Sequence, residues 1–126
     1  MAQYGVWDDH VQRWQAGPFG LSALARWWLE HRPGNGVVAV RAVHGKPRSL
    51  TPGDARRLEQ MTARAELMDI RKRLGYSQRV MAEALGLTKA WYGTLERGQA
   101  EVSRTILLAA RGLLCRATHG ETPAHR

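Results

Sequence analysis

Apolar residues recur every three or four positions over several stretches of the chain, a spacing typical of one face of a helix. The first stretch lies within the first 15 or so residues, where Trp7, Val11 and Trp14 share a face. Asp8 suits the cap at the start of such a helix, and Gly17-Pro18 suits its end. The pattern therefore predicts an N-terminal helix with tryptophan on one side.

Residues 20–31 repeat the helical spacing, and Pro33 with the two glycines of residues 34–36 ends that segment. Residues 37–43 are rich in β-branched side chains and predict a strand, with a turn over 44–47 and a short return strand over 48–50. A two-stranded hairpin is marginally stable alone. It therefore needs cover from the Trp-bearing helices or another strand from a second copy.

A helix start is indicated at Thr51, which suits the N-cap, with Pro52 at the first helical position and Asp54 reaching back. No helix breaker follows until Gly75. The segment fits one long helix or two helices joined near Thr62, and the pattern leaves both open.

Residues 77–98 predict two short helices joined by a three-residue turn. Ser77 caps the first helix, Gly86 ends it, Thr88 caps the second and Gly98 ends that one. The expected inward residues are Val80, Met81, Ala84 and Leu85 in the first helix, and Tyr92 and Leu95 in the second. Ser103 then caps a last apolar helix. Because the second helix buries only one face, its outer face is free to enter a DNA major groove.

This segment resembles the Xre/Cro-like helix-turn-helix regulators, which include phage repressors. The matching residues are Ile70-Arg71, Leu74-Gly75, Ser77-Gln78, Met81-Ala82, Leu85-Gly86, Thr88, Tyr92, Leu95-Glu96-Arg97-Gly98 and Ser103. The resemblance covers about residues 64–115 and leaves the N-terminal half unexplained. It implies an all-helical, lambda-repressor-like domain that binds a two-fold-symmetric operator as a dimer.

The resemblance assigns base reading to Lys89, Ala90 and Thr94 on the outer face of the second helix, where Lys89 can donate to guanine. Trp91 borders the buried stripe, so it covers the core or lies against thymine methyls or sugars. Glycine is unfavourable within a helix. Close approach of the helix to DNA would explain its presence at position 93, and simple tolerance of a weak helix position explains it equally well.

Phosphate contacts are expected from side chains around the two helices: Gln78, Arg79, Arg97 and Gln99. Gln78 stands where free helix N–H groups also attract an anion. Arg71 and Glu96 match a pair that forms an internal salt bridge in the family, so they are expected to brace the fold. Trp91 is large for its position, and Val102 stands where the family often has proline.

The charge composition indicates a polyanionic partner. The chain has 126 residues and a formal net charge of +8, with 19 Lys and Arg against 11 Asp and Glu. Such an excess suits nucleic acid or an anionic membrane. The N-terminus lacks the pattern of a signal peptide and no apolar run is long enough to span a bilayer, so a cytoplasmic protein without a membrane partner is expected. The single cysteine, Cys115, excludes an internal disulfide.

The chain is not expected to be an enzyme, and no cofactor or metal is expected. The five histidines do not have zinc-ligand spacing, and no nucleophile elbow occurs. The segment His44-Gly45-Lys46-Pro47 lacks both the earlier glycine and the following Ser or Thr of a phosphate-binding loop.

The sequence thus predicts a mainly α fold with three parts. Residues 1–63 form a small α+β part with Trp-rich helices and a short hairpin, residues 64–115 form the helix-turn-helix bundle, and residues 116–126 form a disordered tail. The predicted function is a homodimeric repressor of its own promoter or of a phage or mobile-element operon. The N-terminal part serves dimerisation, or it binds a protein partner, as in an antitoxin or anti-activator that uses DNA binding for autoregulation.

Overall fold

The computed structural model describes residues 2–119. The chain divides into two compact units between Thr62 and Ala63, and each is described by itself. Most of the predicted tail, from residue 120 on, lies outside the described residues. Residues 116–118 belong instead to the last helix, so the predicted tail began too early.

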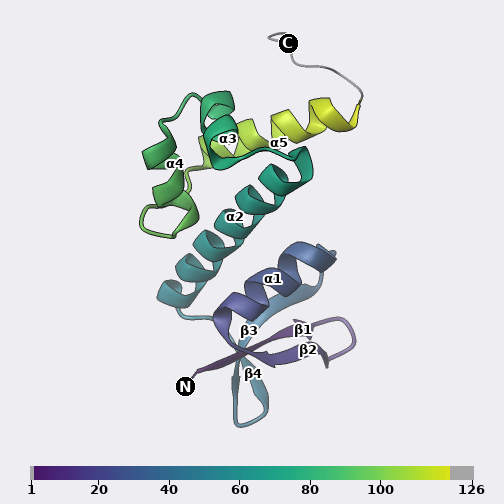
Figure 1. Cartoon of the computed structure of the whole chain (residues 1–126). Coiled ribbons are helices and arrows are strands. Elements are labelled where there is room, and N and C mark those ends of the chain that lie inside the picture. The colour runs from purple at the N-terminus through teal and green to yellow at the C-terminus, as the bar shows by residue number, and fades with distance from the viewer. Residues whose placement is uncertain (1, 120–126) are drawn as a thin grey trace. The chain divides into compact units, whose positions relative to one another are not determined.

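The first unit contains a four-stranded antiparallel sheet with strand order β2-β1-β3-β4 (Figure 1). Its strands are β1 (Gln3–Asp8), β2 (Arg13–Phe19), β3 (Val37–Val43) and β4 (Lys46–Arg48). The hairpin expected from residues 37–50 is present as β3 and β4. It is one half of a larger sheet rather than an isolated hairpin, because β1 pairs with β3 along its whole length.

The predicted N-terminal helix is wrong, because residues 3–19 form β1 and β2. Trp7 and Trp14 are seven positions apart because they pair across the turn that joins the strands. Their rings meet edge to face, with centroids 5.2 Å apart. Asp8 caps no helix; its Oδ1 accepts hydrogen bonds from the backbone N–H groups of His10 at 2.9 Å and Val11 at 3.3 Å. Two residues that pair across a hairpin can therefore have the same seven-residue spacing as two residues on one face of a helix.

The helix expected over 20–31 is confirmed as α1 (Leu21–His31), and it covers one face of the sheet. Tyr4, Val6 and Leu24 form the centre of this core, with Leu24 and Val6 fully buried. Leu58, from the first half of α2, packs against the same core. Alternation along β1 sends Tyr4 and Val6 to this face, which leaves Gly5 and Trp7 on the other.

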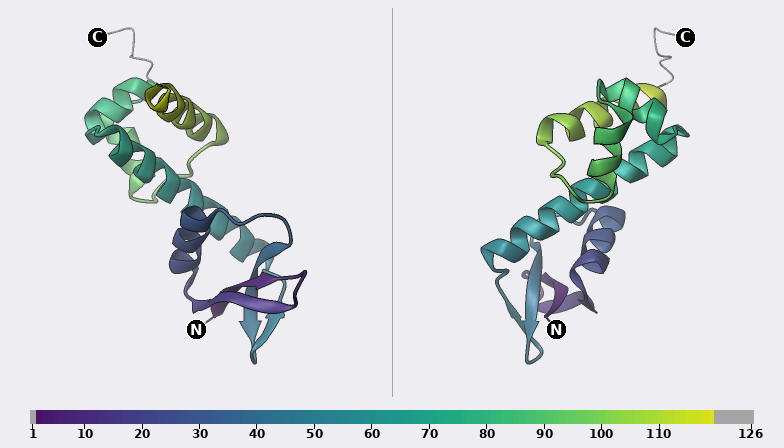
Figure 2. Two further views of the ribbon diagram at one scale, coloured as in Figure 1. Left: turned by 90° about the vertical axis from the view of Figure 1, so that its right-hand side faces the viewer. Right: turned by 60° about the vertical axis from the view of Figure 1, so that its left-hand side comes forward.

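The segment after Thr51 is a single helix, α2 (Pro52–Leu74), which Figures 1 and 2 show without interruption. Thr51 Oγ1 accepts a hydrogen bond from the Asp54 backbone N–H at 3.1 Å, as expected of an N-cap. At Thr62, where a break was one alternative, the hydroxyl donates to the Leu58 carbonyl oxygen at 2.7 Å. The side chain thus bonds within the helix instead of ending it.

The second unit consists of the last part of α2 with α3 (Gln78–Leu85), α4 (Lys89–Glu96) and α5 (Arg104–Thr118). Its core draws on all four helices and on the loop before α5. The buried residues are Ala63, Leu67, Ile70, Met81, Ala82, Tyr92, Leu95, Val102 and Ala110. Val102, which stands where the regulators that the sequence resembles often have proline, is therefore an apolar core residue.

The predicted helix ends of this unit are confirmed. Ser77, Thr88 and Ser103 each accept a hydrogen bond from the backbone N–H three residues later, at 3.1–3.2 Å. Gly75, Gly86 and Gly98 have φ between +71° and +77°, a conformation that favours glycine.

Two residues expected on the inner face of α3 are exposed. Val80 is 44% exposed and Ala84 also faces solvent, whereas Met81 and Ala82 are buried. The buried stripe of α3 is therefore rotated by one position from the predicted one. A helix of eight residues makes barely two turns, so its apolar residues define its inner face poorly.

We predict that Leu24→Ala destabilises the first unit by about 3 kcal/mol, because it opens a cavity at a fully buried site. Urea unfolding followed by circular dichroism measures the loss. Val11→Ala is the control, since Val11 is 52% exposed and its truncation should change the free energy of unfolding by less than about 0.5 kcal/mol. Equal losses from the two variants would contradict the core assigned here.

Candidate nucleic-acid interface

The outer face of α4 carries the predicted base readers Lys89, Ala90 and Thr94, together with Trp91, for which the sequence left core cover and DNA contact open. Lys89, Ala90 and Trp91 are exposed and Thr94 is half-buried, whereas Tyr92 and Leu95 on the inner face are fully buried. Trp91 is 46% exposed, so it does not belong to the core. The helix thus separates a docking face from an outward face, as the sequence predicted.

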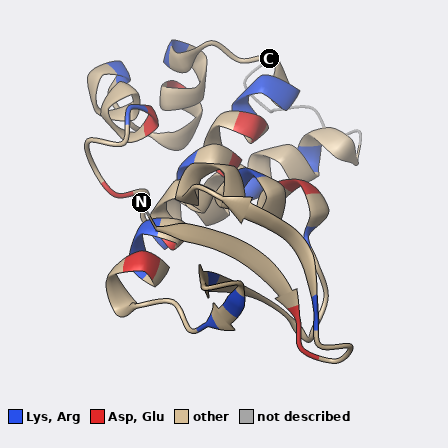
Figure 3. Cartoon of the chain, turned by 90° about the horizontal axis from the view of Figure 1, so that it is seen from below, with Lys and Arg blue, Asp and Glu red and all other residues tan. Residues whose placement is uncertain are grey.

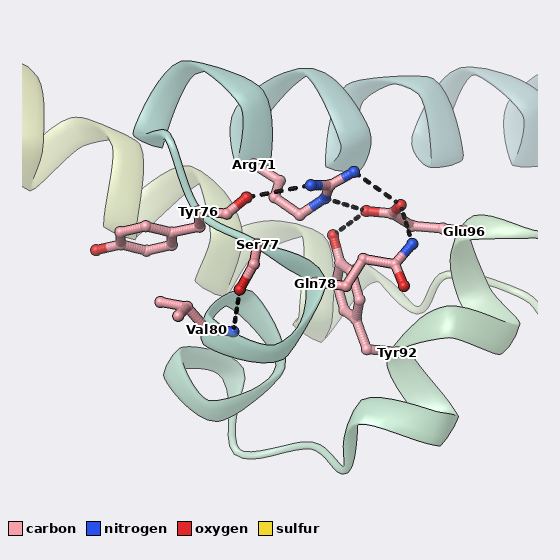
Figure 4. A network of polar contacts seen from close by, with 7 residues as sticks. All are labelled: Arg71, Tyr76, Ser77, Gln78, Val80, Tyr92 and Glu96. Atoms are coloured by element: carbon pink, nitrogen blue, oxygen red, sulfur yellow. Dashed lines mark hydrogen bonds and ion pairs between the residues drawn. The ribbon is translucent and has the colours of Figure 1, made fainter.

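The inner end of α4 is fixed by Glu96, the buried carboxylate at the last position of the helix (Figure 4). Arg71 of α2 donates to both of its oxygens, from Nε to Oε2 at 2.7 Å and from Nη2 to Oε1 at 3.2 Å. Arg71 Nη1 also donates to the Tyr76 carbonyl oxygen at 3.1 Å, in the turn before α3. The pair expected to brace the fold therefore joins α2, the following turn and α4.

Two further donors complete the Glu96 site. The Tyr92 hydroxyl donates to Oε2, and Gln78 Nε2 donates to Oε1 at 2.9 Å. Burial by itself raises the pKa of Glu96, but the hydrogen bonds from Arg71, Tyr92 and Gln78 outweigh it and hold that pKa below the ordinary value of 4.5. Burial, followed by the hydrogen bond to Glu96, raises the pKa of Tyr92. Among the described residues, no buried side-chain nitrogen or oxygen lacks a hydrogen-bond partner.

The placement of Gln78 changes what it can offer to DNA. A carboxylate only accepts hydrogen bonds, so the amide nitrogen of Gln78 must face Glu96 and its Oε1 must face away. That oxygen cannot donate to a phosphate. A phosphate contact at this position has to come from the second Nε2 hydrogen or from the free backbone N–H groups at the start of α3.

A second polar group joins three of the predicted DNA contacts at the end of α4. Arg97 Nε donates to Gln99 Oε1 at 3.2 Å, and Arg97 Nη2 donates to Thr94 Oγ1 at 3.4 Å. The Thr94 hydroxyl itself donates to the Ala90 carbonyl oxygen at 2.9 Å. The guanidinium of Arg97 is therefore held beside the outward face of α4.

Gly93 lies beneath this group and is buried. A Cβ at Gly93 would approach Arg97 Nη1 to 3.0 Å and Gln78 Oε1 to 3.8 Å. Besides the two explanations drawn from the sequence, the glycine thus leaves room for the Arg97 side chain to lie across the helix.

Arg64 is a cation that sequence reasoning missed. A Cβ at Gly98 would come within 2.1 Å of Arg64 Nη1, so the Arg64 side chain lies against the turn after α4. Arg64 belongs to α2, 34 positions earlier, and its residue type and spacing gave no sign of this placement. The turn therefore has two guanidinium groups beside it, those of Arg64 and Arg97.

The remaining predicted cations are exposed. Arg79 lies 3.7 Å from Glu83 Oε1, and both side chains are at least 70% exposed, so this pair is loose. Lys89 is exposed at the first position of α4. Basic and acidic positions are interspersed along the ribbon (Figure 3). The net charge alone therefore does not identify which helix or strand would contact a polyanion.

The comparison with known families decides the identity of this second unit. A family model described as a helix-turn-helix domain matches residues 55–122, more than half of the chain. The chain belongs to this helix-turn-helix family. The match agrees with the resemblance found in the sequence and with the arrangement of α3 and α4, two short helices joined by a tight turn. The narrower Xre/Cro-like relationship remains a prediction.

No curated protein and no solved structure matches the chain significantly. Within residues 2–119, no group of three or more His, Cys, Asp or Glu side chains is arranged to hold a metal ion. Over the same residues, no helix is long and apolar enough to cross a membrane.

We predict that Glu96→Gln destabilises the helix-turn-helix unit by roughly 3 kcal/mol, because it removes the charge that balances Arg71, whose side chain is only 17% exposed. Urea unfolding measures the loss. Asp69→Asn is the matched control: its partner Arg73 is 62% exposed, and losing that pair should cost less than about 0.5 kcal/mol. The assignment fails if the two variants lose the same stability.

Acid should weaken the same contact. Because the pKa of folded Glu96 lies below its ordinary value, its carboxylate contributes stability above about pH 4.5, and that contribution is lost as the pH falls through the lower folded-state pKa. Free energies of unfolding between about pH 6 and pH 3 should therefore fall more steeply for the wild type than for Glu96→Gln. Parallel curves would contradict a lowered pKa at this residue.

Proposed function

We propose that the chain is a sequence-specific transcription regulator, acting as a dimeric repressor on a palindromic operator. The observation that carries the proposal is the two-sided character of α4. Tyr92, Leu95 and Glu96 fasten one side to the unit, while Lys89, Ala90 and Trp91 stand exposed on the other. A recognition helix needs this combination, because bases are read only if the outward side chains are held in a fixed register.

Base reading falls to the outward residues of α4 in this proposal. Lys89 donates to O6 or N7 of guanine, and Thr94 presents its methyl group to thymine because its hydroxyl is engaged by Ala90 and Arg97. Trp91 lies against thymine methyls or the sugar edge. The exposed indole supports a DNA contact, since burying it in a groove removes apolar surface from water.

Phosphate contacts are proposed on both sides of the recognition helix. Arg79 and the free N–H groups of α3 serve one strand, and Arg97 with Gln99 serves the other; Arg64 supports the second set. Gln78 mainly positions Glu96 and adds a phosphate contact through its remaining N–H. These contacts fix the orientation on DNA and carry no sequence information themselves.

The dimer is proposed on geometric grounds. One recognition helix reads only a few base pairs, and a second copy related by a two-fold axis places another reader about 34–36 Å away on the same side of the duplex. In this scheme residues 2–62 serve dimerisation. The regulated operon is proposed to be the protein's own or that of a phage or mobile element.

A second candidate function assigns the first unit to a protein partner, with DNA binding used for autoregulation as in an antitoxin or anti-activator. The exposed apolar residues Trp14, Val38 and Val11 favour it, since exposed apolar patches mark interaction surfaces. A partner that co-purifies in a stoichiometric complex with the native protein would distinguish it from a homodimeric repressor.

Substitution of one reader and one phosphate contact tests the primary proposal. On duplexes selected from a random pool at about 150 mM salt, Lys89→Ala should cost roughly 1–3 kcal/mol of binding free energy and relax the preference at one base position. Arg79→Ala should weaken binding to all duplex sequences alike. It should also reduce the slope of log affinity against log salt concentration by about one released ion. Fluorescence anisotropy measures both effects.

Arg116→Ala is the control for charge alone, because Arg116 is exposed on the last turn of α5. It should leave both affinity and preference unchanged. Failure of the wild type to enrich any duplex sequence would overturn the proposal. Equal, sequence-independent losses of affinity from Lys89→Ala and Arg79→Ala would contradict the assignment of base reading to α4.

A further inference from the structure

The excess positive charge of the first unit lies on the hairpin formed by β3 and β4. Residues 1–62 contain eight Lys and Arg against five Asp and Glu, a formal net charge of +3. Three of the eight cations, and none of the five acids, lie within residues 37–48. Over the rest of the unit five cations balance five acids. The net charge of the unit is therefore that of a single hairpin.

The three cations of the hairpin share one face of the sheet. Arg41 lies opposite Arg48 in the register of β3 and β4, and Lys46 precedes Arg48 by two positions along β4. Opposed residues, and residues two apart on a strand, lie on the same face. Arg41 is also opposite Tyr4 of β1, which belongs to the core under α1. We call Arg41, Lys46 and Arg48 the basic hairpin face.

Opposed arginines do not stabilise the folded sheet. Like charges directly opposite one another on neighbouring strands are destabilising. Among the described residues, neither Arg41 nor Arg48 forms a salt bridge. Protection of an open sheet edge accounts for Lys46 on β4, but not for Arg41, because β3 has a paired strand on each side. An anion held between the two arginines would account for both.

Two contacts fix the cations beside this face. Arg41 Nε donates to the Ser49 carbonyl oxygen at 3.3 Å, which leaves its Nη atoms for another acceptor. Arg57 Nη2 of α2 donates to Asp54 Oδ1 at 3.0 Å. Burial raises the pKa of Tyr4, and the Asp54 carboxylate raises it further. The positive charges of Arg57 and Arg41 lower that pKa, so both guanidinium groups lie near the Tyr4 hydroxyl.

We propose that the basic hairpin face, with Arg57 beside it, binds a phosphate group of the DNA backbone. Neighbouring strands are about 4.8 Å apart, so two opposed guanidinium groups can bracket one phosphate. Each planar guanidinium offers paired N–H donors that match the phosphate oxygens. In the proposed function, on which this inference rests, α4 already holds the chain on DNA, so phosphates of the same duplex are present at a high effective concentration. The ligand is a phosphate outside the sequence that α4 reads.

The two faces of the sheet favour DNA over an anionic membrane. A protein that lies on a membrane presents apolar residues beside its cations, so that both enter the interface together. On β3 the exposed apolar residue is Val38, which is three positions from Arg41 and pairs with Trp7 on the opposite face. The sheet thus separates its exposed apolar residues from its cations. A duplex needs only the cations, because its backbone presents phosphates alone.

The test compares two duplexes that carry a sequence selected by the wild-type chain. The shorter duplex ends at the edges of that sequence, and the longer one extends by about two helical turns, roughly 20 base pairs, on each side. On the longer duplex, Arg48→Gln should lower the affinity about tenfold and reduce the slope of log affinity against log salt concentration by about one ion for each bound copy. On the shorter duplex it should bind like the wild type. Fluorescence anisotropy measures both affinities.

Arg13→Gln is the matched control. Arg13 is exposed on β2, the opposite edge strand of the same sheet, so this variant loses the same charge away from the basic hairpin face. Three strand spacings, about 14 Å, exceed the Debye length of about 8 Å at physiological salt. Arg13→Gln should therefore change the affinity for the longer duplex by less than about twofold.

Circular dichroism melting verifies the fold of each variant. Because Arg48→Gln removes a repulsion between like charges, its melting temperature should equal or exceed that of the wild type. Should it nevertheless fail to fold, Arg41→Gln removes the opposed cation and should lose affinity for the longer duplex in the same way.

Four outcomes would overturn the phosphate site. Wild-type affinity of both arginine variants on both duplexes would show that the cations are only solvated. Equal losses from Arg48→Gln and Arg13→Gln would show a diffuse effect of charge. Equal losses from Arg48→Gln on the two duplexes would place the contact within the sequence that α4 reads. Binding to phosphatidylserine vesicles that depends on Arg48, without a loss on DNA, would identify a lipid headgroup as the ligand.

Failure of this site can be distinguished from failure of the proposed regulator. Enrichment of a duplex sequence by the wild type, with no effect of Arg48→Gln or Arg41→Gln, would reject the phosphate site and keep the regulator. If the wild type enriches no sequence, the same variants are measured on short and long duplexes of arbitrary sequence. A loss confined to the longer duplex would then keep the phosphate site and reject sequence-specific regulation.

Discussion

The helix-turn-helix unit depends on one buried carboxylate. Glu96 receives hydrogen bonds from Arg71 of α2, Gln78 of α3 and Tyr92 of α4, so three helices meet at a single group. Without these donors a carboxylate with only 4% of its side chain exposed would carry a large desolvation penalty. With them, the angle of α4 is set by directional bonds as well as by the apolar contacts of Tyr92 and Leu95. The position of every outward residue on α4 follows from that angle.

Prediction from sequence succeeded where local rules act over a few residues. Ser77, Thr88 and Ser103 cap helices because a side-chain oxygen needs only the N–H three residues ahead, and Gly86 ends α3 because its φ is positive. The Arg71–Glu96 contact spans 25 positions and was expected only through a family resemblance. Arg64 beside Gly98 had neither a local rule nor a motif to indicate it, since packing brings those residues together.

The N-terminal strands show why periodicity alone can mislead. Trp7, Val11 and Trp14 fit one side of a helix, but the same spacing arises when two strands pair around a short turn and their tryptophans meet. The deciding partner is β3, which begins 30 residues after Trp7 and pairs with all of β1. Long-range pairing of this kind overrides local preference. Val80 illustrates the same limit on a smaller scale, because the inner face of a two-turn helix is chosen by its neighbours.

The group around Arg97 has a thermodynamic consequence. An exposed arginine normally has many rotamers, and fixing it on a phosphate costs about 0.5–1.5 kcal/mol of conformational entropy. Here Thr94 and Gln99 already restrict the guanidinium, and Gly93 provides the space in which its side chain lies. Much of that ordering therefore occurs when the domain folds rather than when it meets DNA. In the proposed complex, Thr94 and Gln99 thus act on affinity by limiting the freedom of Arg97, whether or not they touch the duplex themselves.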